Sequence, residues 1–318
     1  MRDRQKLYII HDGKAAYPEL AAYRKFLAPD FDSEELTREQ AALRPDIGDS
    51  ICWHVMGFYP QRLPAKVVIH DYRSLSVGRM REMKDRLKYF LNARPDIRIF
   101  QNEAMRQAMG FDDKVPTLLL PMGVPDFIKD YRKPSQQQTG PDYVYIGAMS
   151  AERKSHLMVD SFLKRFGDEK TFVLYGKPEP YLPERYAANA NVRFAGTLPQ
   201  EELFPQLTTA GACVCYFPNH YPHLLQTPTK MLEYAALGLR IIANRQALSL
   251  ATAKTYGINC LWGPSDDMFA EAPDVIAWPD NAGVDADAFL WPAVIRDSGI
   301  ATQIHTLLEK DRYVRAAG

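Results

Sequence analysis

The sequence predicts an α/β protein that contains two units of parallel β-sheet. Three observations lead to this fold class: short apolar runs alternate with helical stretches, several runs are apolar without interruption, and a polar segment divides the chain near its middle. Alternating strands and helices form parallel sheets with helices on both faces. Uninterrupted apolar runs such as TLLL and RIIA suit strands that are covered on both sides.

The first unit is expected over residues 1–130. Its short apolar runs predict strands at Lys6–His11, Ser50–Val55, Lys66–His70, Ile97–Gln101 and Thr117–Leu120. The longer stretches between them predict helices at Glu19–Leu27, Gly78–Ala93 and Glu103–Met109. Each helix connects two strands, as parallel pairing requires.

A linker is expected at residues 131–142 (YRKPSQQQTGPD), which are polar and contain Pro, Ser and Gly. A second unit follows over 143–284, and residues 285–318 form a helical tail. The strands expected in the second unit are Tyr143–Ile146, Thr171–Tyr175, Val192–Ala195, Ala212–Phe217, Arg240–Ala243 and Val275–Trp278. The helices are Lys154–Phe166, Gln200–Thr208 and Lys230–Leu237. Two such units place a cleft between the carboxyl ends of two sheets, where open parallel sheets bind ligands.

Composition excludes several classes of protein. The 318 residues carry 39 basic and 39 acidic side chains, which argues against a protein that mainly holds duplex DNA. The four cysteines are too few for a disulfide scaffold. No window approaches 18 apolar residues, and the N-terminus has only four in a row, too few for a signal peptide. We therefore expect a cytoplasmic protein, alternatively one held peripherally at the inner face of the membrane.

The segment Gln226–Gly238 (QTPTKMLEYAALG) carries the strongest functional signal. Thr227 is a good N-cap, Pro228 suits the first helical position and Gly238 suits the stop. A helix N-terminus binds phosphate, and Lys230 adds a cation in the first turn. Glu233 lies one turn further on and could accept the hydroxyls of a ribose. The alternative is an i,i+3 salt bridge between Lys230 and Glu233 on a solvated helix.

The stretches around this helix resemble the family-4 (group 1) glycosyltransferases, which have the GT-B fold of two Rossmann-like domains. The similar stretches are YIGAMSAERK, VLYGK, NVRFAGTLPQEEL and TPTKMLEYAALGLRIIA in the second unit, and VVIHD and LLLPMGVP in the first. The resemblance implies two Rossmann-like domains that face each other across a cleft. The first would bind the acceptor and the second a nucleotide sugar.

The resemblance also implies a donor site. The residues that it assigns to the donor are Arg153, Lys154, Lys177, Thr229, Lys230 and Glu233. Cations and a helix N-terminus aimed at the leaving diphosphate stabilise the transition state, and Thr229 would contribute its backbone N–H. The family's Glu-x7-Glu pattern is incomplete, because Leu225 stands at the first position. The Arg that usually follows the strand-end glycine is also missing, since Ala148 follows Gly147.

Further candidates surround the reacting sugar. His70 and Asp71 end a predicted strand and would act as catalytic groups that exchange protons near pH 7. Four residues would contact sugar or acceptor, each with a purely structural role as the alternative: Gly13, His54, His220 and His223. Lys177 could equally be a solvated loop lysine. No metal site is expected, because the lysines can balance the diphosphate charge.

The stretch 79–94 (RMREMKDRLKYFLNAR) has six basic and two acidic residues, with Met80, Met83, Leu87 and Phe90 or Leu91 at helical spacing. One interpretation is a solvated helix packed on its sheet. The other is contact with an anionic membrane surface or a lipid-pyrophosphate acceptor, as the resemblance suggests.

We therefore expect a glycosyltransferase (EC 2.4 class) that moves a sugar from a nucleotide-diphosphate donor, UDP in preference, to a hydroxyl group of a glycan or lipid-linked acceptor. The resemblance implies a retaining, metal-independent reaction without a cofactor, in glycan or bacterial surface-polysaccharide synthesis. The alternative is a non-catalytic glycosyltransferase-like protein that binds nucleotide or glycan or supports a partner. A dehydrogenase is disfavoured because no GxGxxG motif follows a strand. No nucleic-acid partner is expected.

Overall fold

The computed structural model describes residues 4–13, 17–55, 57–76, 80–134 and 138–317. The chain divides into two compact units, the first of Met1–Gly123 with Leu290–Gly318 and the second of Val124–Phe289. This division differs from the expected one, because the tail joins the N-terminal unit. Trp291 explains the difference: its ring lies against Tyr23, with the ring centroids 6.1 Å apart, in the first unit.

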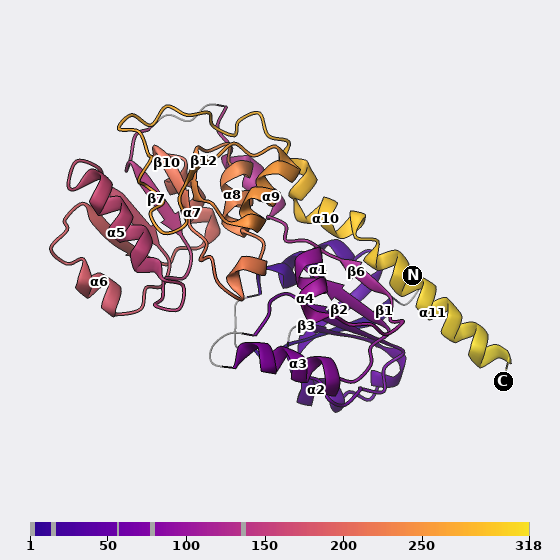
Figure 1. Ribbon diagram of the computed structural model, residues 1–318. Helices are drawn as coiled ribbons and strands as arrows, with labels where there is room; N and C mark the ends of the chain where they lie inside the picture. Colours follow the sequence, from indigo (N-terminus) through magenta and orange to yellow (C-terminus); the bar gives the residue numbers. More distant parts are fainter. Residues whose placement is uncertain (1–3, 14–16, 56, 77–79, 135–137, 318) are drawn as a thin grey trace. The chain divides into compact units, whose positions relative to one another are not determined.

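The first unit is built on a six-stranded parallel sheet in the order β2-β1-β3-β4-β5-β6 (Figure 1). Its strands are β1 (Gln5–Ile10), β2 (Phe31–Leu36), β3 (Ile51–Val55), β4 (Val67–Tyr72), β5 (Ile97–Phe100) and β6 (Thr117–Leu119). Its helices are α1 (Pro18–Leu27), α2 (Arg38–Ala42), η1 (Ile47–Asp49), α3 (Arg81–Leu91), α4 (Glu103–Met109), α10 (Trp291–Asp297) and α11 (Ile300–Ala317). The strand order reverses direction between β1 and β3, which makes their carboxyl ends a place for ligands.

The second unit is built on another six-stranded parallel sheet, in the order β12-β11-β10-β7-β8-β9. Its strands are β7 (Tyr143–Ile146), β8 (Phe172–Tyr175), β9 (Val192–Gly196), β10 (Ala212–Cys215), β11 (Ile241–Asn244) and β12 (Leu261–Gly263). Its helices are η2 (Asp126–Tyr131), α5 (Ser155–Phe166), α6 (Tyr181–Arg185), α7 (Gln200–Leu207), η3 (His223–Leu225), α8 (Thr229–Ala236), α9 (Ala247–Tyr256) and η4 (Ala286–Phe289). Here the order reverses between β7 and β10.

Aromatic side chains hold α5 against the second sheet. Phe162 of α5 packs on Phe172 of β8 and on Phe269, with ring centroids 5.0 Å and 5.6 Å apart. Figure 1 shows α5 on one side of this sheet and α8 with α9 on the other. The sheet is therefore covered on both faces, and its carboxyl edge is left for a site.

One predicted strand is absent from the structure, and one observed strand was not predicted. Val275–Trp278 is not a strand, and Val275 is exposed. The sixth strand is instead β12, which has only three residues. In the first unit, β2 has the sequence FDSEEL, whose polar residues gave no strand signal.

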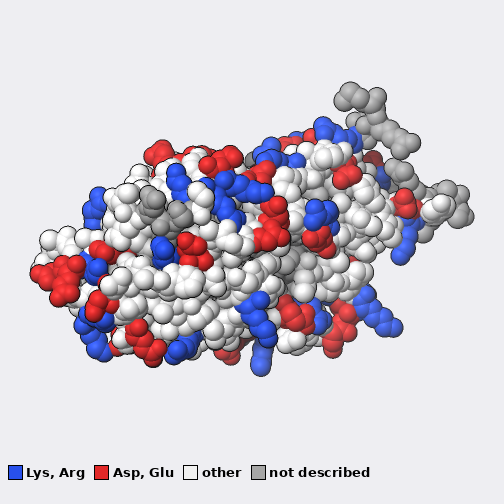
Figure 2. Space-filling view, turned by 90° about the horizontal axis from the view of Figure 1, so that it is seen from above, with Lys and Arg blue, Asp and Glu red and all other residues white. Residues whose placement is uncertain are grey.

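Charged side chains of both signs are spread over the surface. Figure 2 shows Lys and Arg interspersed with Asp and Glu across the face in view, as the zero formal charge leads one to expect. Among the described residues, no helix is both long enough and apolar enough to cross a membrane.

Candidate functional site

A pocket of about 400 Å³ lies at the carboxyl edge of the second sheet. Segments that follow β7, β8 and β9 line it, together with the start of α8. The lining residues are Ile146, Gly147, Ala148, Tyr175, Gly176, Lys177, Thr197, Leu198, Leu203, Thr229, Lys230 and Glu233. Four of the six predicted donor residues therefore meet in one pocket: Lys177, Thr229, Lys230 and Glu233. It lies beside the point where the strand order reverses, the usual ligand position in such sheets.

Two glycines open this pocket. Gly147 and Gly176 end β7 and β8 with φ values of +129° and +130°, which favour glycine. A Cβ on Gly176 would overlap the backbone carbonyl of Gly147. The two strand ends can therefore lie against each other only without side chains, which leaves the space above them to a ligand.

The start of α8 differs from the expected cap. Pro228 is the N-cap rather than the first helical residue, and no side chain caps the helix. Pro228 has φ −76° and ψ 77°, close to an inverse γ-turn, and the Thr229 N–H donates to the Thr227 carbonyl at 2.9 Å. This corrects the expectation that the Thr229 N–H serves the donor, because the turn already uses it.

Lys230 is a buried cation at the pocket wall. Its Nζ donates to the Tyr145 hydroxyl at 2.9 Å and to the Tyr216 carbonyl at 3.2 Å. The same Nζ lies 4.2 Å from the Tyr145 ring centroid and 4.9 Å from that of Phe217, so aromatic faces surround it. An ammonium has three N–H donors, and these two bonds leave one for a ligand in the pocket.

Glu233 lies beside Lys230 but has its own partner. Its Oε1 accepts a hydrogen bond from Gln200 Nε2 at 3.0 Å. Burial raises the pKa of Glu233 to about 7, although the Gln200 bond and the Lys230 charge both lower it. The two side chains thus take different partners, which does not favour the alternative of a solvated i,i+3 salt bridge.

The structure does not bring Arg153 and Lys154 into the lining of this pocket. Both belong to the turn before α5, where the Arg153 N–H donates to Ser150 Oγ at 3.1 Å. Lys154 has a φ of 50°, and its carbonyl accepts from the Tyr216 hydroxyl at 3.3 Å. Their predicted role toward the diphosphate stays a prediction.

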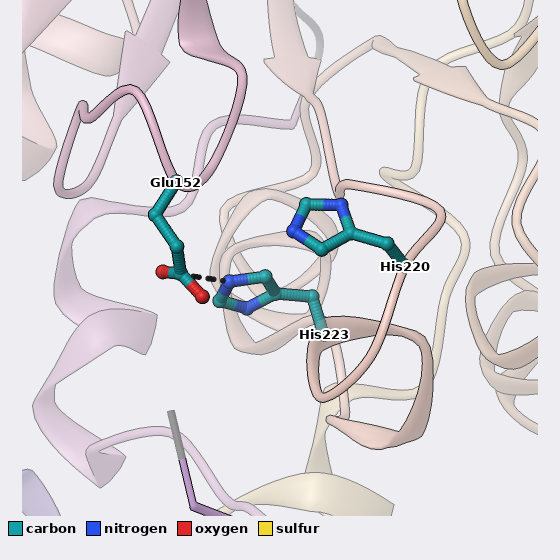
Figure 3. A group of neighbouring side chains, drawn as sticks. All are labelled: Glu152, His220 and His223. Carbon is teal, nitrogen blue, oxygen red and sulfur yellow. Dashed lines mark hydrogen bonds and ion pairs between the residues drawn. The ribbon is translucent and has the colours of Figure 1, made fainter. Parts of the chain in front are cut away.

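His220 and His223 form a separate cluster with Glu152. Figure 3 shows the two histidines on the loop between β10 and α8 and Glu152 on the turn before α5. His223 Nε2 lies 3.3 Å from Glu152 Oε2, and His223 Nδ1 lies 3.2 Å from Gln226 Oε1. Burial and the Arg153 charge lower the pKa of His223, although Gln226 and Glu152 raise it. Sequence analysis placed both histidines near the sugar but did not pair them with Glu152.

His54 and His70 are neighbours in the first unit. They pair across β3 and β4, and their ring centroids lie 5.5 Å apart, beside Tyr59. Burial lowers the pKa of His54 to about 3 and that of His70 well below its usual value. Both rings are therefore neutral at pH 7, which corrects the expectation that His70 exchanges protons there. Nδ1 of each ring is buried without a hydrogen-bond partner in the described structure.

Asp71 does not share a face with His70. Strand β4 continues to Tyr72, and successive residues of a strand point to opposite faces. The Asp71 carboxylate accepts from the Tyr23 hydroxyl and from Trp53 Nε1, both at 3.1 Å, and lies 3.6 Å from Arg73. Burial raises its pKa to about 6. We expected a strand-end catalytic group, but the structure places Asp71 in a buried polar layer.

Gly13 lies three residues after the end of β1. It has a φ of +66°, and no atom of the described residues lies within 4 Å of where a Cβ would be. Its N–H donates to His11 Nδ1 at 3.1 Å. The geometry leaves space beside this strand end, and a contact with sugar or acceptor stays a prediction.

Helix α3 turns its apolar residues outward. The exposed fractions are 58% for Met80, 46% for Met83, 43% for Leu87, 74% for Phe90 and 50% for Leu91. On its other side, the Asp85 carboxylate accepts from the Ser76 N–H at 3.1 Å, and the Tyr89 ring stacks on Phe111 with the centroids 5.2 Å apart. The helix is therefore largely solvated, as one interpretation expected, and its apolar stripe is exposed. Arg79 lies outside the described residues.

Sequence reasoning missed the residues that hold the two pocket charges. Tyr145 binds Lys230, and Gln200 binds Glu233. Tyr145 lies within β7, whose sequence appeared entirely apolar. Gln200 is the first residue of α7, the helix that precedes β10, whereas Glu233 lies in α8 after that strand. A tyrosine two residues before a strand-end glycine was the available signal.

The second unit is similar to a known protein family. Residues 140–274 match the family model of the group 1 glycosyl transferases. HepE of Anabaena, solved with UDP and glucose, has 12% identity to the chain and a TM-score of 0.59, covering 99% of this chain and 100% of its own. AviGT4, a glycosyltransferase involved in avilamycin A biosynthesis, has 16% identity and a TM-score of 0.57, with 99% of each chain covered.

A third similar structure is a glycosyltransferase from Rickettsia africae, with 11% identity and a TM-score of 0.60 over 96% of this chain and 97% of its own. The comparison with curated proteins gives no match. The structural likenesses confirm the predicted α/β fold of two Rossmann-like units, as in GT-B proteins. The match over residues 140–274 agrees with the predicted resemblance of the second unit to the group 1 glycosyltransferases.

Proposed function

We propose that this protein, whose residues 140–274 form a group 1 glycosyltransferase domain, moves a sugar from a UDP-linked donor to a hydroxyl group of an acceptor. The observation that carries this proposal is the pocket in which a buried ammonium and a carboxyl group lie side by side at a strand-order reversal. HepE was solved with UDP and glucose, which supports UDP as the carrier.

Each of these side chains would bind a different part of the donor. The third N–H of Lys230 would bind the diphosphate, and Lys177 at the pocket mouth would add a second charge. Glu233 would accept the ribose hydroxyls as a carboxylate. As the sugar–phosphate bond breaks, negative charge grows on the diphosphate, so a fixed cation stabilises the transition state more than the ground state. Arg153 and Lys154 would approach the diphosphate from the turn before α5.

The reaction itself is proposed as retaining and metal-independent at the diphosphate, with no cofactor. The departing phosphate oxygen would take the acceptor proton on the face that the acceptor attacks. His70 is proposed near the donor sugar as a neutral hydrogen-bonding ring, and its unpartnered Nδ1 supports such a contact. His54, Gly13, His220 and His223 are proposed around sugar and acceptor. Glycan or surface-polysaccharide synthesis is the proposed setting.

A lipid-linked acceptor at the inner face of a membrane is the proposed partner of α3. The exposed stripe Met83–Leu87–Leu91 is flanked by Lys84 and Arg86, which supports contact with an anionic bilayer. Such a helix lies in the interface with its apolar residues inserted and its cations on lipid headgroups.

A non-catalytic nucleotide-binding protein is the alternative, favoured by Leu225 at the family's first Glu position. Thermal-shift titrations with UDP, GDP and a panel of nucleotide sugars, followed by assays of donor hydrolysis and transfer, separate the two. Turnover of one UDP-sugar supports the transferase. Binding without turnover of any donor, with acceptor glycans present, supports the alternative. No stabilisation by any nucleotide would contradict both.

A further inference from the structure

The hydrogen bonds of His223 leave two acceptor atoms facing each other. Gln226 Oε1 can only accept, so the Nδ1 atom 3.2 Å away carries the ring proton. In a neutral imidazole the Nε2 atom then presents a lone pair. That lone pair lies 3.3 Å from Glu152 Oε2, which also only accepts when ionised. Two acceptors at this distance repel each other unless the ring takes up a second proton or a metal ion lies between them.

The spacing of these atoms fits a metal ion. In a tetrahedral site with bonds of about 2.0–2.1 Å, two ligand atoms lie about 3.3 Å apart. His223 Nε2 and Glu152 Oε2 already have this spacing, and the ligand atoms of His220, His223 and Glu152 all lie within 4.8 Å of one another (Figure 3).

The chemistry of the three donors indicates the kind of ion. Two imidazoles and one carboxylate form a donor set used for zinc, with a fourth position left for water or substrate. A metal-binding histidine usually donates its other N–H to an oxygen, which Gln226 Oε1 provides for His223. We propose that Glu152, His220 and His223 bind one divalent transition-metal ion of the zinc class.

This metal site would be separate from the lysines that are proposed to bind the diphosphate. It joins the turn before α5 to the loop between β10 and α8, where Leu225 replaces the family's first Glu. Ala148 and Thr229, near the ends of these segments, line the pocket. The ion would fix the loop beside the pocket, and its binding needs no nucleotide. The inference therefore stands or falls independently of the proposed transfer reaction.

One neighbouring charge opposes the ion and gives a test of its own. Arg153 acts electrostatically on His223 and lowers its pKa. The same positive charge would weaken the binding of a dication. Arg153→Gln should therefore bind the metal more tightly than the wild type, and weaker binding would count against the site.

The experiment uses the full-length protein without a histidine tag, freed of metal with EDTA. Zn²⁺ is titrated by calorimetry, and Co²⁺ is titrated by its visible absorption as a spectroscopic probe of ligand geometry. We expect one ion per chain. Glu152→Gln and His220→Gln should each weaken binding at least tenfold, since even the loss of an outer partner costs about 10–100-fold. The matched controls are Glu184→Gln, which is exposed on α6, and His156→Gln on α5.

The site is overturned if neither ion binds with one-to-one stoichiometry, or if Glu152→Gln and His220→Gln bind as the wild type does. Glu152 has a side chain that is 40% exposed, so its replacement leaves the fold intact and a loss of binding cannot be ascribed to unfolding. His223→Gln is a second variant, checked for folding by circular dichroism, because this ring is buried. Retained one-to-one binding in that folded variant would also overturn the site.

Discussion

Charged groups lie near the carboxyl ends of β4 in the first unit and of β7 in the second, but their surroundings differ. In the first unit, Asp71 is enclosed by Tyr23, Trp53 and Arg73, and the neighbouring His70 ring is buried among aromatic rings. In the second unit, Lys230 and Glu233 border an open pocket. Both regions hold ionisable groups away from water, but only one leaves room for a ligand.

The residues at the strand ends account for this difference. Strand β4 ends in Tyr72, whose ring stacks on Phe100 with the centroids 5.2 Å apart. Strands β7 and β8 are followed by Gly147 and Gly176, which have no side chain to fill the space. In the first unit an aromatic ring therefore fills the space beside the strand end, and in the second unit the two glycines leave that space to the pocket.

Replacing Asp71 should have the largest effect and should act on folding. Asp71→Ala removes the partner of two buried donors and leaves Arg73 without its nearest carboxylate, which typically costs about 3–5 kcal/mol. Urea unfolding followed by tryptophan fluorescence measures the loss, with Asp112→Ala as an exposed control. A change below about 1 kcal/mol would show that the two regions do not differ as described.

Replacing Lys230 should act on binding instead. A charged hydrogen bond to a diphosphate is worth about 1.5–3 kcal/mol, so Lys230→Ala should weaken UDP binding about 10–150-fold and lower kcat/KM. Calorimetry with UDP measures the change, and Lys254→Ala on α9 is the control. UDP affinity within twofold of the wild type would remove Lys230 from the site.

Replacing Phe90 tests the outer surface of the first unit. This side chain is 74% exposed, so Phe90→Ser should leave the free energy of unfolding within about 0.5 kcal/mol. Binding to vesicles that contain anionic lipid should fall about tenfold, because insertion of an aromatic ring is lost. Co-sedimentation measures this binding, with Leu250→Ser on α9 as an exposed apolar control. Equal sedimentation of wild type and Phe90→Ser would exclude α3 as the membrane contact.

Replacing Glu233 should have the smallest effect and a distinct pH dependence. With a pKa of about 7, the carboxylate that accepts ribose hydroxyls forms as the pH rises from 6 to 8. Uridine, which has no phosphate, should bind more tightly over this range. Glu233→Gln should lose that dependence and bind about 2–12-fold more weakly at pH 8. Equal losses for uridine and for pyrophosphate would remove the ribose role.

The same pKa fixes the sign of a stability effect. Because folding raises the pKa of Glu233 from 4.5 to about 7, its contribution to stability is complete below pH 4.5 and is lost as the pH rises through 7. The Tm of Glu233→Gln minus the Tm of the wild type should therefore be more positive at pH 8 than at pH 5. A relative change of opposite sign would show that the carboxyl group is not buried in solution.

The regular parts of the fold could be predicted because short apolar runs specify buried parallel strands. Tyr143–Ile146 and Glu103–Met109 have the predicted bounds. Lys230 and Glu233 of α8 lie together in one pocket, although the predicted Thr227 cap does not form. Strand β2 could not be predicted, because its polar residues follow from its position at the sheet edge.

Contacts between residues that are far apart in the chain could also not be predicted from the sequence. Gln200 reaches Glu233 across 33 residues, and Glu152 reaches His223 across 71. The buried Asp85 of α3 accepts from the Ser76 backbone N–H, nine residues away, as well as from Lys88 on its own helix. Only the packing of the sheets brings such partners together.

The contact between Gly147 and Gly176 also limits how the pocket can be redesigned. Any larger residue at Gly176 meets the backbone of the neighbouring strand end, so variation there would disrupt the sheet rather than retune recognition. Libraries aimed at new ligands should keep both glycines and vary other lining residues, such as Thr197, Leu198 and Leu203. Natural diversification of this pocket would follow the same route, with its glycines fixed and its side chains free to change.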